Sequence, residues 1–336
     1  MTARPQHARA RRAAAAALAV ALTAGLAGCG TPLPAPEAPA APAVAPAALT
    51  AGQVDRVLAD LGTVLAAGDA ALDPAALGPR VTGPALAVRT AEYVRQTATA
   101  GARTPTVLPT RAQSVVVPAT TTWPRTQLVV TEQPADLQAQ RILVLQQPDA
   151  RSPYRLWGWA RLLPGVQLPA VASSATGSPV LAADTDALRL APAQVLEQYA
   201  DVLTNGDASA AAPAFAADAF RDGLRTAREQ TAASVAAVAT VAESTVAVPE
   251  GVVALGTLDG GAIVVGQTTT TTTLTVSQGS LTLDPTEAAL SGRPEVTRTL
   301  VYTYQDVLAF HVPAAGSSDP VRLLAAEHGR VSVSGE

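Results

Sequence analysis

Few side chains of this 336-residue chain could perform catalysis or bind a metal ion. The chain has a single cysteine, Cys29, and three histidines, His7, His311 and His328. One cysteine excludes a disulfide framework and a thiolate zinc site, and three scattered histidines do not form a histidine cage. The Gly-x-Ser-x-Gly motif, the phosphate-binding loop and the dinucleotide fingerprint do not occur in the sequence. We therefore expect no metal, no cofactor and no assembled catalytic triad.

The charges of the chain are unevenly distributed. All 23 basic residues are arginines and stand against 27 acidic residues, which gives a formal net charge of −4. Four of the arginines lie within residues 1–12, so the rest of the chain is more acidic. A chain with a net negative charge is repelled by the phosphates of nucleic acid. A hydrophobic fraction of 48% is sufficient to build packed cores. These values exclude nucleic-acid binding and global disorder.

The N-terminus has the order of a secretory signal peptide. Residues 1–12 are basic, and residues 13–27 form an uncharged apolar run that is shorter than the roughly 20 residues of a membrane-spanning helix. The run ends in Leu-Ala-Gly-Cys at residues 26–29, which resembles the signal of a bacterial lipoprotein. The resemblance implies that residues 1–28 are removed and that Cys29 carries a diacylglycerol. An ordinary signal peptide with an incidental cysteine is the alternative, which we favour less because the chain has no other cysteine.

Residues 29–48 are rich in proline and alanine. They contain six prolines and one charged residue, Glu37. Since proline fixes φ and removes a backbone donor, we expect a loose polyproline II tether between the membrane and the folded part. A ligand for a proline-binding module is the alternative that we favour less.

Two amphipathic helices are related by a constant offset of 138 residues. The first begins at a capping-box pattern, Thr50 with Gln53, and is predicted to end at Gly68. A third helix in each half is predicted around Leu86 and Leu224, at the same offset. The matched pairs of the first helix and its turn are Val57/Val195, Leu58/Leu196, Leu61/Tyr199, Val64/Val202, Leu65/Leu203, Gly68/Gly206 and Asp69/Asp207. The sequence predicts two copies of one unit. The alternative is that the match reflects helix periodicity alone, because any two amphipathic helices match at some apolar positions when one is shifted along the other.

Both halves change to strand patterns after their helices. In the first half the predicted strands are 114–117, 127–131, 141–146 and 154–163. In the second half they are 240–248, 251–258, 262–265, 269–276, 296–304, 307–312 and 321–333. This order predicts an α+β fold of two tandem units, each with N-terminal helices packed on a curved antiparallel sheet. The expected domains are 49–168 and 187–336, joined by a linker at 169–186 that is rich in Pro, Ser and Gly.

The order of elements resembles the nuclear transport factor 2-like fold, also called cystatin-like or SnoaL-like. The resemblance rests on the helix, the Gly-Asp turn, the short helices and the strands that follow them in each half. It implies that the helices close one side of a cone-shaped sheet and that the cone holds a ligand or an active site. The Cys29 signal, the tether and the doubled unit together resemble lipoproteins of high-GC Gram-positive bacteria, and this second resemblance implies no particular function.

Enzymes of this fold place an Asp, His or Tyr inside the cone as a general acid or base. Tyr199 lies on the apolar stripe of its helix, so we expect a core residue whose hydroxyl reaches one partner. Asp218 is expected to cap the helix that follows it. His311 is expected at a strand end, and His328, which precedes Gly329, in a turn. We therefore expect structural roles for these residues and no catalytic residue.

The most informative segment of the mature chain contains Arg155, Trp157, Trp159 and Arg161. In a strand these four side chains would alternate onto one face. Two tryptophans flanked by two arginines suit a sugar ring, a lipid headgroup or an anionic partner, which makes the four residues ligand-binding candidates. Packing of the tryptophans under the helices is the alternative, and we favour it. Gly158 would permit a close approach on the other face.

Residues 268–273 are six consecutive threonines. Branched side chains suit the pleat of a strand, so we expect a solvated strand here. O-glycosylation and a polar binding ladder are the alternatives for a secreted protein.

The sequence favours a lipid-anchored, extracytoplasmic and non-catalytic binding or interaction module of the cell envelope. Its expected partners are the membrane, through the N-terminal diacylglycerol, and an envelope protein, glycan or lipid ligand. Two alternatives stay open. One is a small-molecule enzyme of isomerase or hydrolase type that uses one cone, and the other is a structural accessory in cell-wall assembly. Ionisable groups that converge in a cavity would favour the enzyme, and a cone filled by its own side chains would favour protein contacts.

Overall fold

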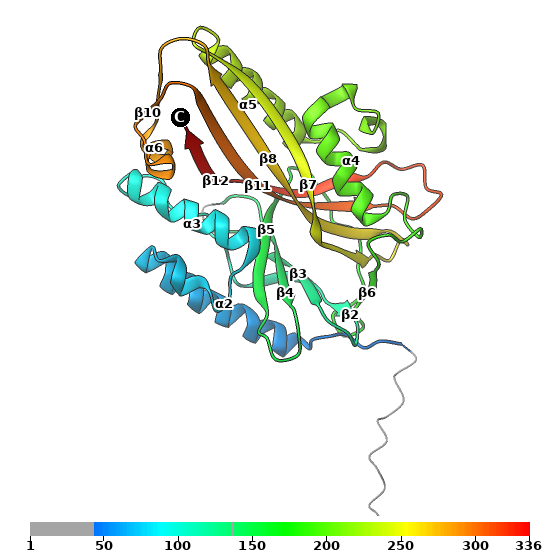
Figure 1. Cartoon of the computed structure of the whole chain (residues 1–336). Helices are drawn as coiled ribbons and strands as arrows, with labels where there is room; N and C mark the ends of the chain where they lie inside the picture. Colours follow the sequence, from blue (N-terminus) through cyan, green and yellow to red (C-terminus); the bar gives the residue numbers. More distant parts are fainter. Residues whose placement is uncertain (1–43, 136) are drawn as a thin grey trace, which may run out of the picture. The chain divides into compact units, whose positions relative to one another are not determined.

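Helices precede strands twice along the chain, which confirms the predicted α+β class (Figure 1). The structure is a computed structural model that describes residues 44–135 and 137–336. The predicted signal peptide, Cys29 and the tether up to residue 43 lie outside the described residues. Among the helices that are described, none is long and apolar enough to cross a membrane.

The first half contains helix α2 (Ala51–Ala71), the 3₁₀-helix η1 (Pro74–Leu77) and helix α3 (Gly83–Ala98). Helix α2 begins at the predicted capping box, where the backbone N–H of Thr50 donates to Gln53 Oε1 at 2.8 Å. The prediction that this helix ends at Gly68 is wrong, because the helix continues to Ala71. Gly68 is instead a packing position, since a Cβ there would lie 2.9 Å from the hydroxyl oxygen of Tyr93.

The second half repeats this order of helices. It contains α4 (Pro192–Asn205), the 3₁₀-helices η2 (Gly206–Ala208) and η3 (Ala212–Ala214), and α5 (Ala219–Val235). Asp218 caps α5 as predicted, and its carboxylate accepts the backbone N–H of Arg221 at 2.8 Å. A further helix, α6 (Pro285–Ser291), follows in a segment for which the sequence predicted no element.

Ten strands form one curved, nearly closed sheet. The four strands of the first half are β1 (Ala112–Val116), β3 (Arg125–Thr131), β4 (Arg141–Gln147) and β5 (Arg155–Leu162). The four long strands of the second half are β7 (Ala239–Gly256), β8 (Ala262–Val276), β11 (Thr299–Val312) and β12 (Arg322–Gly335). The short strands β2 (Pro118–Ala119) and β6 (Ser178–Leu181) complete the sheet, and β9 (Leu281–Thr282) pairs separately with β10 (Glu295–Val296).

Each half contributes an antiparallel meander to this sheet. The order is β1-β3-β4-β5 and then β12-β11-β8-β7-β6-β2, so the last strands of the two halves are neighbours. Strands β5 and β12 join through only two residue pairs, Ala325 with Leu162 and Ala326 with Arg161. The second half has four long strands where the sequence predicted seven short ones. The break predicted near Gly251, for example, is an irregularity in the pairing of β7, whose register shifts between Val248 and Val253.

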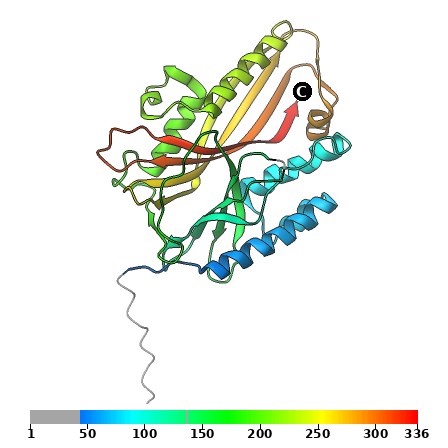
Figure 2. The same ribbon diagram turned by 180° about the vertical axis from the view of Figure 1, so that it is seen from behind.

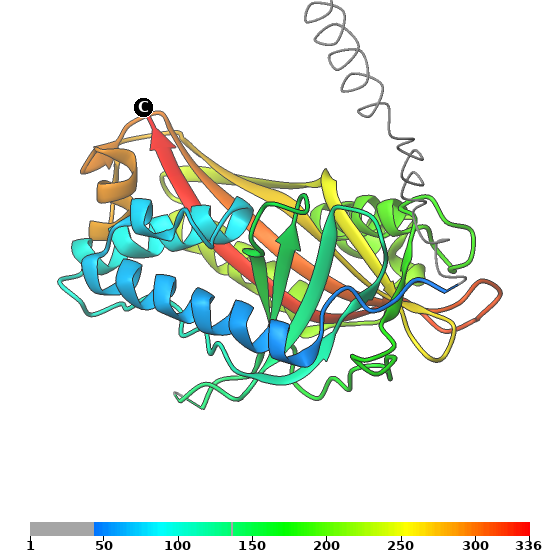
Figure 3. The same cartoon turned by 90° about the horizontal axis from the view of Figure 1, so that it is seen from below.

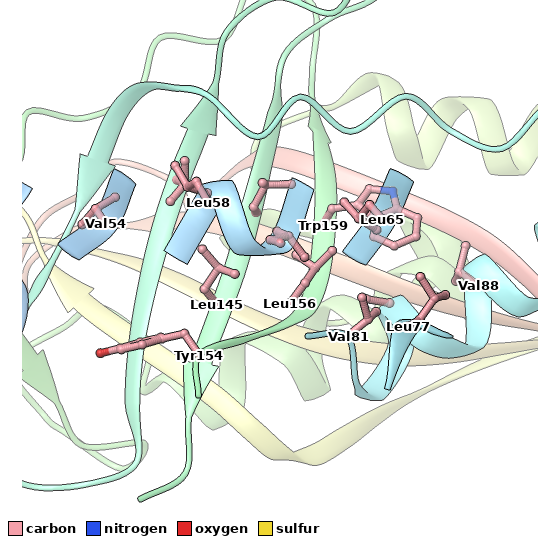
Figure 4. Close-up of a cluster of buried hydrophobic side chains, with 14 of the residues drawn as sticks. Val54, Leu58, Leu65, Leu77, Val81, Val88, Leu145, Tyr154, Leu156 and Trp159 are labelled. Atoms are coloured by element: carbon pink, nitrogen blue, oxygen red, sulfur yellow. The ribbon is translucent and has the colours of Figure 1, made fainter. Parts of the chain in front are cut away.

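Of the four apolar clusters in the described residues, the three largest hold most of the sheet and the helices together. The first core draws its buried members from residues 49–159 and lies between α2, α3 and strands β3 to β5 (Figures 3 and 4). The second core draws its buried members from residues 188–326, and its buried helix residues come from α4, which packs on β7. Figure 2 shows helix α5 along the long strands of the second half. The shared core takes the other faces of strands from both halves. Its buried members are Val116, Leu128, Val130, Ile142, Val144, Ala160, Leu255, Ile263, Val265, Val307, Ala309, Leu324 and Ala325.

The prediction that Trp157 and Trp159 lie on the same face of the strand is wrong. The pairing of β4 with β5 shifts where Val144 faces Gly158 and Leu145 faces Leu156, so Trp157 is an extra residue in a bulge. Trp159, which is 2% exposed, belongs to the first core, whereas Trp157 packs against the shared core. Arg155 is half-buried and Arg161 is exposed, so the four candidates do not form a common platform.

Replacement of Trp159 by alanine should lower the free energy of unfolding by about 3 to 5 kcal/mol, because it removes a large buried ring and leaves a cavity. Urea denaturation followed by circular dichroism measures this loss. The control is Leu258→Ala, which truncates a side chain that is 69% exposed and should change the stability by less than about 0.5 kcal/mol. Equal stabilities of Trp159→Ala and the wild type would contradict the core assignment.

Candidate functional site

A buried carboxylate, Asp306, forms the centre of the site. It lies in β11 and is fully buried. The strand register places Asp306 opposite Thr268 of β8 on one side and His328 of β12 on the other. Cross-strand neighbours point to the same face, so the three side chains meet. Asp306 accepts hydrogen bonds from the Thr268 hydroxyl at 3.0 Å, the Thr270 hydroxyl at 2.6 Å and His328 Nδ1 at 2.6 Å.

His328 is the exposed member of this group. Its side chain is 25% exposed, and its ring stacks on Tyr304 with 4.0 Å between the ring centroids and 12° between the planes. Phe220 of α5 meets the ring edge-on at 6.2 Å. Because the Asp306 carboxylate accepts from Nδ1, the proton is held on that nitrogen and Nε2 is the nitrogen free to meet a ligand. The pair has the geometry of an oriented general base.

Threonines of β8 continue the polar face on which Asp306 lies. Thr270 also exchanges a hydrogen bond with Thr245 at 2.9 Å, and Thr272 donates to Glu243 at 2.8 Å. Thr268, Thr270 and Thr272 are buried, while the threonines between them are partly exposed. The expectation of a wholly solvated strand is therefore wrong for alternate residues, whose hydroxyls supply donors to buried carboxylates.

Three hollows meet at His328. The polar hollow, of about 440 Å³, lies between α3 with the segment after it and β12, and its lining includes Glu92, Arg95, Arg103, Arg161 and Glu327. The α6 hollow, of about 450 Å³, is lined by the same Arg95 and Arg103 together with Tyr304 and the start of α6. The apolar hollow, of about 560 Å³, lies beside the start of α5. Its lining includes Leu162, Leu163, Pro164, Ala219, Phe220 and Ala326.

Arginines dominate the charge of the first two hollows. Arg95, Arg103 and Arg330 line both, and Arg161 lines the polar and the apolar hollow. Arg95 lies 3.4 Å from Glu92, and Arg330 lies 3.2 Å from Glu287. Arg103 and Arg161 are exposed. The charge of Arg161 acts on Glu327, whereas the guanidinium of Arg103 has no ion pair within residues 44–135 and 137–336. A surface with more arginines than carboxylates therefore lies on an acidic chain.

The acidic residues of the hollows are partly neutralised. Glu92 is buried and binds the guanidinium of Arg89 at 3.0 Å as well as Arg95. Burial raises the pKa of Glu327, and the charge of Arg161 opposes this shift. Asp284 accepts the backbone N–H of Glu287 as the cap of α6. No group of three His, Cys, Asp or Glu residues in the described part of the chain could hold a metal ion.

Three of the four ionisable candidates from the sequence have the expected structural roles. Tyr199 is fully buried, donates its hydroxyl to Asp218 at 3.0 Å, and its pKa is raised by burial. Burial also raises the pKa of Asp218, which caps α5. His311 lies near the end of β11, 3.0 Å from Asp259, and burial lowers its pKa.

The turn expected at His328 is wrong, because this residue lies inside β12. Asp306 is not among the residues expected from the sequence, because the predicted strands end at Tyr304 and begin again at Val307. The polar pair Gln305-Asp306 before the apolar residues 307–310 gives the pattern of a break between strands. The signal that could have found the pair is the alternation of Tyr304 with Asp306 and of His328 with Arg330 at period two.

A family model described as Domain of unknown function (DUF8094) matches residues 44–335. The chain belongs to this family. The match covers both halves, all of the strands and the whole of the site around His328. No curated protein matches the chain. No solved structure matches it either.

Thr270→Val should destabilise the protein by about 1 to 3 kcal/mol, because the buried Asp306 carboxylate loses a donor that water cannot replace. Thr271→Val is the matched control, since the same change on the opposite face of the strand removes no donor to Asp306 and should have an effect below about 0.5 kcal/mol. Urea denaturation of both variants measures the difference. Equal losses would show that the hydrogen bonds to Asp306 contribute nothing to stability.

Proposed function

We propose that this protein is a lipid-anchored binding module on the extracytoplasmic face of the cell membrane. The Leu-Ala-Gly-Cys segment at residues 26–29 and the proline-rich residues that follow it support the anchor and the tether. The family match begins at residue 44, near the end of the predicted tether. In a tethered protein, the folded part is expected to begin at this point.

The observation that carries the binding function is the meeting of three hollows at His328. Each hollow has between 440 and 560 Å³ of space, which is within the range of small-molecule sites. The first and second cores, in contrast, are filled by their own side chains. Tyr199, Phe215 and Phe310 pack together in the second core with centroid separations of 5.0 to 6.3 Å. A ligand is therefore better accommodated beside the cores than inside either cone.

We further infer that the halves are two tandem units of the nuclear transport factor 2-like type. In the first half, Leu156 at the start of the last strand exchanges backbone hydrogen bonds with Arg80 and Thr82, just before the third helix. In the second half, Val321 makes the same pair of bonds with Ala214 and Ala216, also before the third helix. Shared strand order and shared crossover bonds support duplication more strongly than the helical offset does alone.

Cys29→Ala should abolish incorporation of labelled fatty acid into the protein, because no other thiol can accept a diacylglycerol. Metabolic labelling with an alkyne fatty acid in the producing cell, followed by immunoprecipitation, measures this loss. Ser173→Ala, in the predicted linker, is the control and should retain the label. Label that persists in Cys29→Ala would remove the basis for the anchor.

Protein purified from its native membrane should carry a small molecule that native mass spectrometry detects after mild release from detergent. The mass of this molecule should disappear from a variant in which Phe220→Glu places a charge beside His328. Glu250→Gln, on the distant irregularity of β7, should retain it. A wild-type protein that carries no small molecule, and that instead copurifies with one envelope protein, would favour the structural accessory.

A small-molecule enzyme is the second candidate, and the His328–Asp306 pair is the observation that favours it. A histidine oriented by a buried carboxylate can accept a proton at Nε2 from a bound substrate. If the protein is an enzyme, incubation with wild-type protein should convert the released molecule into a product that differs in mass or, for an isomer, in chromatographic retention, and His328→Gln should leave the molecule unchanged. If it is a binding module, both proteins should leave the molecule unaltered.

A further inference from the structure

We propose that the ligand of this site is an anionic amphiphile, a carboxylate or phosphate monoester that carries an apolar chain. The proposal rests on the binding function argued above and assigns a chemical class to its ligand. The anionic group lies in the polar hollow against Arg103 and Arg161, and the chain lies in the apolar hollow against Phe220. His328 stands at the junction of the two.

The positive charge of the polar hollow supports an anion. Five arginines line it, including Arg103 and Arg161, against the two carboxylates of Glu92 and Glu327. Glu92 is already engaged by Arg89 and Arg95, and Glu327, whose pKa is raised by burial, faces the charge of Arg161. The five guanidinium groups therefore outnumber the two carboxylates. The rest of the chain is acidic, so an excess of arginine at one place is not a consequence of composition. Guanidinium groups bind carboxylate and phosphate through paired hydrogen bonds.

The lining of the apolar hollow supports a hydrocarbon chain. Apart from Gln138, Arg161, Glu327 and His328 at its border with the polar hollow, its lining is apolar. Phe220 is only partly buried, and Ala219 at the start of α5 is exposed. Burial of each methylene of a ligand chain there would contribute about 0.8 kcal/mol. A free inorganic anion would leave this surface uncovered, and an uncharged chain would leave the Arg103 guanidinium without an ionic partner and the excess positive charge of the polar hollow unbalanced.

The two hollows share Arg161 and His328, so one molecule can span them. His328 Nε2 is the nitrogen that Asp306 leaves available, and it lies at the border where the polar part of the ligand meets the apolar part. The stacked ring of Tyr304 and the edge-on ring of Phe220 fix the orientation of His328. A preorganised imidazole with a carboxylate behind it adds a polar contact without a loss of side-chain entropy.

Titration calorimetry of the mature chain, residues 29–336 without lipid, tests the proposal with four probes. Decanoate and decyl phosphate should bind with a stoichiometry of one. Decanol, which lacks the charge, and inorganic phosphate, which lacks the chain, should each bind at least about tenfold more weakly, a loss of about 1.4 kcal/mol. The ratio of the first two affinities distinguishes a carboxylate from a phosphate headgroup.

Three variants locate the binding. Arg103→Gln combined with Arg161→Gln should weaken decanoate binding by about tenfold or more, since each guanidinium makes a charge-assisted contact. Ala219→Glu should weaken it similarly while helix α5 is retained, because an acidic residue is favourable in a first turn. Arg56→Gln removes an exposed arginine of α2 that lines none of the three hollows, and it should leave the affinity unchanged. Melting temperatures confirm that each variant is folded.

Three results overturn the proposal. Decanol that binds as tightly as decanoate would rule out the anionic group, inorganic phosphate that binds as tightly as decyl phosphate would rule out the chain, and the failure of both amphiphiles to bind would rule out the chemical class. If neither amphiphile binds while the native protein carries another small molecule, the chemical class is wrong and the binding function stands. If the native protein carries no small molecule and neither amphiphile binds, both proposals fail.

Discussion

Strands that are apolar on both faces constrain the whole structure. In β4, Leu143 and Leu145 face the first core while Ile142 and Val144 face the shared core, and strands of the second half show the same division. A strand of this kind must be covered on two sides, because water on either face would cost the free energy of exposing branched apolar side chains. Helices cover one side, and the sheet of the other half covers the other. Each half therefore covers an apolar face of the other.

The sequence predicted those parts of the fold that depend on local chemistry. The capping box at Thr50, the cap at Asp218 and the α+β order follow from hydrogen-bonding groups close together in the chain. The bulge at Trp157 could not be predicted, since only the pairing with β4 shows that one residue is extra. The sequence predicted breaks in the long strands of the second half for the same reason. Pairing with the neighbouring strand keeps β7 continuous on both sides of Gly251, and the sequence of β7 alone does not show this pairing. The division into domains 49–168 and 187–336 stays a prediction, supported by separate cores and opposed by a shared one.

The site was harder to predict than the fold because its members are remote in sequence. Arg161 was a ligand-binding candidate because it would form a platform with Trp157 and Trp159. That platform does not form, but Arg161 lines two hollows. The alternation of Tyr304 with Asp306 places both on one strand face, but it does not identify the partners of Asp306, because Thr268 and His328 lie 38 and 22 residues away. A buried carboxylate is tolerated only where donors surround it, and the sequence of one strand does not show what the adjacent strands supply.

The absence of a side chain at Gly329 allows the two halves to pack closely at the site. A Cβ at this position of β12 would overlap the side chain of Val88, so helix α3 of the first half lies directly on the strand that carries His328. Arg95 and Arg103 come from the first half, and His328 and Arg330 from the second. The site is thus a property of the junction, and neither half holds a complete version of it. A gene that encoded either half alone would therefore lack the site, although every residue of that half would be unchanged, so the site is inherited only with the fused chain.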